Sequence, residues 1–181
     1  MNPDPSFWII VGILITTLLV ALNAFFVASE FALVKIRFSQ LELEIKQGKK
    51  WAFKTKKILE NLDSYLSGIQ LGITVASLLL GWVWEPTIAT WIAHFLSESD
   101  IILSETLIHA IAFGIALFCI TLMHIVFGEQ IPKLVAIKSP LKVASWIALP
   151  LILFQKLFFP FIWLFDTLTR FTMRTMGFEG N

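Results

Sequence analysis

The sequence predicts an all-α integral membrane domain with three transmembrane helices. Of its 181 residues, 57% are hydrophobic and only 15% are charged, whereas soluble domains are nearer a quarter charged. Three long segments contain no Asp, Glu, Lys or Arg: 7–29, 66–84 and 106–128. Each can cross the hydrocarbon core, and a crossing segment must be helical to satisfy its own backbone polar groups. We therefore expect transmembrane helices at 7–37, 64–92 and 106–128.

The charges between these helices indicate an orientation. Segment 35–63 is rich in lysine, whereas segment 85–105 has no basic residue and carries several carboxylates. The positive-inside rule then places the first segment in the cytoplasm and the second, with an outer loop at 93–105, outside. We expect the N-terminus outside, the C-terminus inside, and a multi-pass protein of the cell's inner (plasma) membrane.

The first cytoplasmic segment, 38–63, is expected to form two short juxtamembrane helices on the inner membrane surface. Ser39 and Glu42 have the spacing of a capping box, in which Ser39 is the N-cap. The stretch 51–59 has one apolar face and one basic face, as helices that lie in the membrane interface do.

The stretch after the third helix, 129–176, is expected to form a cytoplasmic juxtamembrane belt of proline-broken helices. Residues 143–165 are apolar enough to span, but a proline inside a helix removes a hydrogen bond and kinks the chain. A further span would also carry Arg170 and Arg174 outside, against the charge rule. We favour helices that enter or skim the inner leaflet and return. The prolines that punctuate this region are Pro140, Pro150 and Pro160.

Polar and small residues form a stripe along each predicted transmembrane helix. They recur every seven residues in the first and third helices and at i, i+4, i+7 and i+11 in the second. Both spacings place residues on one helix face. Close packing between helices explains most of these positions without any ligand. The sets are Thr16, Asn23, Glu30 and Arg37; Gln70, Thr74, Ser77 and Gly81; and Gly114, Thr121 and Gly128.

Glu30 and Glu129 lie near the cytoplasmic ends of the first and third helices. One interpretation is a solvated charge at a helix end. The other starts from Pro132, which we expect to break the third helix and leave carbonyls without partners. Broken helices bind cations in membrane transporters, and a carboxylate with carbonyl and hydroxyl oxygens suits a hard cation such as Mg²⁺.

Enzymes and nucleic-acid-binding proteins are not indicated. The sequence has no Cys/His cluster, no Gly-rich phosphate loop, no nucleophile elbow and a net charge of only +1. The single cysteine, Cys119, is interpreted as a small buried apolar side chain. His124, on the third helix, is interpreted as a core-packing residue rather than a ligand.

Three motifs resemble the signatures of the CNNM/CorC (hemolysin C-like) transmembrane family. They are NAFFVASEFALVK from Asn23, QLGITVASLLLGW from Gln70 and GEQIPK from Gly128, in the family's order across nearly the whole chain. The resemblance implies three transmembrane helices, a cytoplasmic helical pair, a juxtamembrane belt and a homodimer in the lipid bilayer. It also implies cytoplasmic CBS domains, so we expect residues 1–181 to be the membrane domain of a longer protein.

The function that this resemblance implies is divalent-cation transport. It is chiefly export of Mg²⁺, with Co²⁺ as a further candidate ion and Na⁺ as the coupling ion. The leading hypothesis places the site in the inner half of the membrane, where Lys133 would neutralise the main ligand when the site is empty. That ligand is Glu129; the helpers are the Gly128 carbonyl, Asn23, Ser29, Glu30 and Thr74, and Gln70, Ser77 and Lys133 are further pathway candidates.

Two positions depart from the family's pattern of Mg²⁺ ligands. Val27 stands where serine is typical, and Ile73 stands where a polar residue, often asparagine, is found. Neither side chain can ligate a cation, so two alternatives stay open. One is an exporter of organic diamines, whose ammonium groups Glu30 and Glu129 would hold. The other is a non-transporting membrane anchor or sensor for the cytoplasmic domains.

Overall fold

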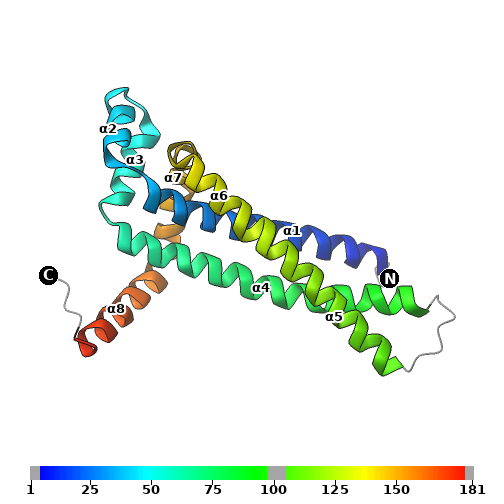
Figure 1. Cartoon of the computed structure of the whole chain (residues 1–181). Coiled ribbons are helices and arrows are strands. Elements are labelled where there is room, and N and C mark those ends of the chain that lie inside the picture. Colours follow the sequence, from blue (N-terminus) through cyan, green and yellow to red (C-terminus); the bar gives the residue numbers. More distant parts are fainter. Residues whose placement is uncertain (1–4, 98–104, 178–181) are drawn as a thin grey trace. The chain divides into compact units, whose positions relative to one another are not determined.

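The computed structural model describes residues 5–97 and 105–177, which are helical almost throughout and contain no strand. The predicted all-α class is therefore confirmed for these residues (Figure 1). The elements are α1 (Pro5–Lys35), α2 (Phe38–Lys46), α3 (Lys50–Leu59), α4 (Leu62–Ser97), α5 (Glu105–Met123), a π-helix η1 (His124–Gln130), α6 (Ile131–Lys138), α7 (Pro140–Leu157) and α8 (Phe159–Thr175).

Four stretches of the described helices are long and apolar enough to cross a membrane. They are Ile10–Lys35, Leu62–Val83, Phe113–Lys138 and Pro140–Leu157. The first three overlap the predicted transmembrane helices, and the fourth is the stretch that we interpreted as juxtamembrane. α4 continues as a helix to Ser97, and residues 98–104 of the predicted outer loop lie outside the described residues.

The third predicted transmembrane helix does not break at Pro132, so that prediction is wrong. α5 passes into the π-helix η1, and η1 passes into α6, whose second residue is Pro132. In a π-helix each N–H bonds the carbonyl five residues back, as Ile131 does with Val126. The wider turn shifts the carbonyl that the proline ring would strike in a regular α-helix, so the chain stays helical.

The chain divides into two compact units, of which the first comprises Met1–Ala24 and Thr74–Ile131. Its apolar cluster contains Leu19, Val20, Leu80 and Ile120. Cys119 is exposed, so its predicted burial is wrong. α5 turns Ile120 toward the cluster, which leaves its neighbour Cys119 on another face of the helix.

The second unit comprises Phe25–Ile73 and Pro132–Asn181 and holds the larger apolar core. The core joins the end of α1, α3, the start of α4, α6 and α7, with Phe26, Ile58, Ile147 and Leu151 almost fully buried. α1 and α4 approach closely here, since a Cβ added at Gly72 would lie 2.4 Å from the Phe26 ring.

The predicted pair of short helices is confirmed as α2 and α3, which pack against each other. Ser39 is not the N-cap of α2, because the helix starts at Phe38 and Arg37 occupies the cap position without a side-chain hydrogen bond. The chain leaves α1 and re-enters a helix after two residues, which places Ser39 inside the first turn. α3 packs its buried residues, Ala52, Thr55 and Ile58, toward α7.

The predicted proline-broken belt is only partly correct. Pro140 and Pro160 each lie in the first turn of a helix, where the missing N–H removes no intrahelical bond. The break expected at Pro150 is absent, since α7 continues through it. Pro150 lies on the exposed face of α7, whereas Ala148 and Leu151 are buried and hold the opposite face in place.

Candidate functional site

A completely buried asparagine joins three helical segments of the first unit. Asn23, on α1, is 0% exposed within a helix that is apolar enough to span a membrane. Its Nδ2 donates a hydrogen bond to the Gly128 carbonyl of η1 at 3.1 Å. The Ser77 hydroxyl, on α4, donates to Asn23 Oδ1 at 3.3 Å. The structure thus brings together three residues that the sequence singled out.

The Gly128 carbonyl receives a side-chain donor because of Pro132. In an α-helix this carbonyl would accept from the N–H of residue 132, and a proline has none. The amide of Asn23 supplies a donor instead. The helix itself continues, and whether Pro132 leaves a carbonyl without a helical partner stays a prediction.

The glycine is also required sterically. A Cβ added at Gly128 would lie 2.7 Å from Cδ2 of His124 and 3.3 Å from Nδ2 of Asn23. Real Cβ atoms are almost never found as close as the first of these distances. Gly128 therefore allows both the imidazole and the amide to approach the backbone of η1.

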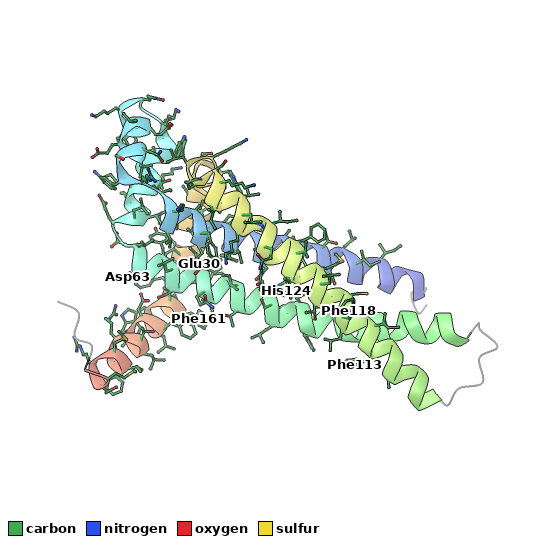
Figure 2. The ribbon with its side chains drawn as sticks, viewed as in Figure 1. Glu30, Asp63, Phe113, Phe118, His124 and Phe161 are labelled. Atoms are coloured by element: carbon green, nitrogen blue, oxygen red, sulfur yellow. The ribbon has the colours of Figure 1, made fainter. Side chains whose placement is uncertain are left out.

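His124 is the functional candidate that the sequence interpretation underrated. It is the first residue of η1 and is labelled near the middle of Figure 2. Its Nε2 is buried and has no hydrogen-bond partner among the described residues. Such a group costs free energy in an apolar environment. Its spacing of four residues before Gly128 was the available signal, because that spacing places both residues on one helix face.

A second unpartnered polar atom lies on α1. Thr16 is 4% exposed, and its Oγ1 has no hydrogen-bond partner among the described residues. It precedes Asn23 by two helical turns on the predicted stripe, and both side chains are buried, as expected of residues on one helix face.

The carboxylate candidate of this unit is Glu129, which is half-buried and follows Gly128 on η1. Thr74 is exposed on α4, three residues before Ser77. No group of three or more His, Cys, Asp or Glu side chains in residues 5–97 and 105–177 could hold a metal ion. A cation here would be held by mixed oxygen ligands and water, which is how Mg²⁺ is commonly bound.

The remaining candidates lie in the second unit. The hydroxyl of Ser29, which is fully buried, donates to the Phe25 carbonyl of its own helix at 2.7 Å. Lys133 lies 4.7 Å from the centre of the Phe31 ring and acts electrostatically on Glu30. The predicted neutralisation of Glu129 by Lys133 stays a prediction. Gln70 is exposed on α4.

The two departures from the family's ligand pattern are packed apolar positions. Val27 is 6% exposed, and Ile73 packs against the apolar core of the second unit. Neither position offers a ligand, so any cation site in this chain must rely on the other polar residues.

The comparisons with known proteins cover nearly the whole chain. The family model of the cyclin M transmembrane N-terminal domain (CNNM) matches residues 14–181. The UPF0053 protein YrkA of Bacillus subtilis is 41% identical over 169 residues, which are 93% of this chain and 38% of that protein.

More distant relatives show the same coverage. The uncharacterized protein Rv1841c of Mycobacterium tuberculosis is 32% identical over 168 residues, or 93% of this chain and 47% of that protein. The UPF0053 protein sll0260 of Synechocystis is 32% identical over 159 residues, which are 88% of this chain and 35% of that protein. The chain therefore spans less than half the length of each of these relatives.

Proposed function

The chain belongs to the cyclin M (CNNM) family of transmembrane domains, and from that premise we propose that it is the membrane part of a divalent-cation exporter. The observation that carries the proposal is the buried junction of Asn23, Ser77 and Gly128. Polar groups inside membrane helices are costly, and where they persist they commonly line ion pathways. The junction lies at a π-helix, a feature that is frequent at functional sites.

Mg²⁺ is the leading substrate because the available ligands are hard oxygens. Asn23 holds the Gly128 carbonyl in place, and that oxygen has a second lone pair for a cation. Glu129 contributes the negative charge. Ser29, Glu30 and Thr74 stay as helper candidates, and Na⁺ is the proposed coupling ion.

The proposed topology has three spans, with the N-terminus outside and the C-terminus inside. In this arrangement α7 is a juxtamembrane helix rather than a fourth span. Its packing against α3 supports this, because α3 carries four lysines and such a basic helix belongs at the cytoplasmic surface.

The proposed assembly is a homodimer in the bilayer. Several polar and small positions of the predicted stripes are exposed in the single chain: Thr74, Gly81, Gly114 and Thr121. A Cβ added at Gly81 or Gly114 would meet no atom within 4 Å. Small and hydroxyl residues are typical of helix contacts in membranes, so a second copy would cover these positions. Cytoplasmic CBS domains are expected in the remaining length of the full protein.

A diamine exporter is the second candidate, and Val27 and Ile73 favour it. Both are apolar where the family's Mg²⁺ ligands are expected, whereas an organic dication needs only two carboxylates, Glu30 and Glu129. No metal ligand would be required at the other positions.

Flux measurements with the full-length protein in proteoliposomes separate these candidates. We expect Mg²⁺ uptake into inside-out vesicles, reported by an entrapped indicator, and a response to an opposing Na⁺ gradient. Uptake of radiolabelled putrescine without Mg²⁺ flux would establish the diamine exporter. If protein that is shown to be folded transports neither Mg²⁺ nor putrescine, the non-transporting membrane anchor is the remaining interpretation.

Cysteine labelling in intact cells tests the topology. Cys119 must be replaced first, because it is exposed and would react itself. We expect Ser99→Cys to be labelled from outside, and Lys49→Cys and Thr175→Cys to be protected. External labelling at residue 175 would mean that α7 spans the membrane.

A further inference from the structure

The outward face of α3 combines lysines with an exposed aromatic ring. Lys50, Lys54, Lys56 and Lys57 line one shallow groove of about 520 Å³ together with Phe53 and Glu60. Phe53 is 51% exposed. Exposing a phenyl ring to water is unfavourable, whereas lysines attract negatively charged groups. A face that carries both is therefore suited to a partner with charged and apolar parts.

Most of these lysines have no carboxylate partner in the part of the chain that the structure describes. Among the described residues, only Lys56 of this groove has a carboxylate within salt-bridge distance, Glu60 at 4.0 Å. Glu44 of α2 pairs with Lys49, which is not part of the groove. The groove therefore carries an excess of positive charge.

The rest of the helix prevents this face from turning inward. Ala52, Thr55 and Ile58 are each 0% exposed on the opposite side of α3, which packs against α7. α3 also ends at Leu59, only a few residues before α4 begins at Leu62. In Figure 1, α3 runs across the direction of the start of α4 instead of continuing it. The lysines are thereby fixed beside the end of a membrane-spanning helix.

We propose that the groove of Lys50, Phe53, Lys54, Lys56 and Lys57 binds the headgroups of anionic phospholipids. The ammonium groups contact the lipid phosphates, and Phe53 enters the boundary between headgroups and acyl chains. Clusters of four or more lysines beside a transmembrane helix bind anionic lipids through this charge complementarity. The binding fixes the depth and orientation of α3 in the membrane interface. Because α3 packs against α7, it also fixes the position of α7. This role does not depend on which substrate the domain transports.

Native mass spectrometry of the full-length protein tests the proposal directly. The protein is released from bilayers of equal phosphatidylglycerol and phosphatidylcholine, and the retained lipids are counted. Each lysine near an anionic surface favours contact by roughly fivefold, so Lys50→Gln, Lys54→Gln and Lys57→Gln together should lower the preference for phosphatidylglycerol at least tenfold. The three lysines are not buried, so we expect the variant to fold.

The matched control removes equal charge from exposed lysines outside α3: Lys46→Gln, Lys138→Gln and Lys142→Gln. We expect this variant to keep its lipid preference. Equal loss in the control, or an unchanged preference in the α3 variant, would overturn the proposal. Displacement of the lipid by millimolar inorganic phosphate would also overturn it, because the groove would then bind free phosphate.

The wild-type protein gives an independent measurement that needs no variant. Salt screens charge interactions at a surface, so the preference for phosphatidylglycerol should decline between 0.05 M and 0.5 M NaCl, on the order of severalfold. A preference that is insensitive to salt would contradict binding by these lysines.

Discussion

The side-chain amide of Asn23 donates a hydrogen bond to the backbone carbonyl of Gly128, 105 residues further along the chain. The contact joins α1 to the π-helix η1. It gives the Gly128 carbonyl a hydrogen-bond donor, which Pro132 cannot supply because a proline has no N–H. In a membrane segment, where water is scarce, this interaction stabilises the local backbone and also holds one carbonyl oxygen in a defined position.

Asn23→Ala removes both hydrogen bonds of the junction. The Gly128 carbonyl and the Ser77 hydroxyl would lose their described partner, so we expect a loss of about 1–3 kcal/mol in stability. Thermal unfolding in a mild detergent measures this. Thr17→Ala is the control, since Thr17 is exposed and bonds only a carbonyl of its own helix. Equal stability of the two variants would contradict a structural role for Asn23.

Gly128→Ala tests whether the close approach at η1 is needed. The new methyl group would meet His124 Cδ2 at 2.7 Å, so the imidazole or the helix must move, and we expect slower transport by roughly tenfold or more. Leu122→Ala is the control in the same transmembrane segment, because this side chain is 52% exposed and lies outside the stripe proposed for the homodimer contact. Full transport by the Gly128 variant would show that the geometry of η1 tolerates displacement.

The helices of this fold could be predicted because a bilayer imposes them. Charge-free segments of sufficient length must be helical, and the lysine-rich segment 35–63 gave the correct pair α2 and α3. The burial of individual residues could not be predicted in the same way. A membrane helix is apolar both toward lipid and toward its neighbours, so periodicity did not distinguish exposed Cys119 from buried Ile120.

The site was predictable only where a motif or a polar stripe marked it. Asn23, Ser77 and Gly128 were found because polar and glycine residues are unusual inside such helices. The π-helix was not found, because it has no simple sequence pattern of its own. The spacing of four residues between His124 and Gly128 was a sequence signal, but by itself it does not distinguish a functional histidine from a core-packing one.

His124→Leu separates packing from function at this position. The substitution removes a buried nitrogen that has no partner among the described residues, so stability should rise by about 1 kcal/mol. If the imidazole serves the transport site, flux should fall although the fold becomes more stable. Thermal unfolding and proteoliposome flux on the same preparation check both parts. Lower stability with unchanged flux would identify His124 as a packing residue alone.

Val27→Ser tests whether the site uses the family's usual geometry. The hydroxyl restores an oxygen at a position where serine is typical, so Mg²⁺ affinity should rise, by roughly fivefold in calorimetry. Ala28→Ser is the control at the neighbouring position, which packs into the apolar core of the second unit. Unchanged or weaker binding in the Val27 variant would mean that the cation is held elsewhere.

Glu129→Gln keeps the size of the side chain and removes its charge. A hard dication held by one carboxylate and neutral oxygens loses most of its attraction when that carboxylate is neutralised, so we expect flux to fall by roughly tenfold or more. The homodimer should survive, because Glu129 is only half-buried and forms no described ion pair. Flux in proteoliposomes and mass by light scattering measure the two properties.

Glu30→Gln provides the internal comparison for this last prediction. Glu30 is half-buried near Lys133, so it can act as a structural counter-charge without binding a substrate. Loss of flux in both variants would support a site with two carboxylates, which is also what a diamine requires. Loss in the Glu129 variant alone would support the mixed oxygen site beside Gly128. A fully active Glu129 variant would remove the proposed ligand, because a solvated helix-end charge contributes little, and the substrate would then be bound by other residues.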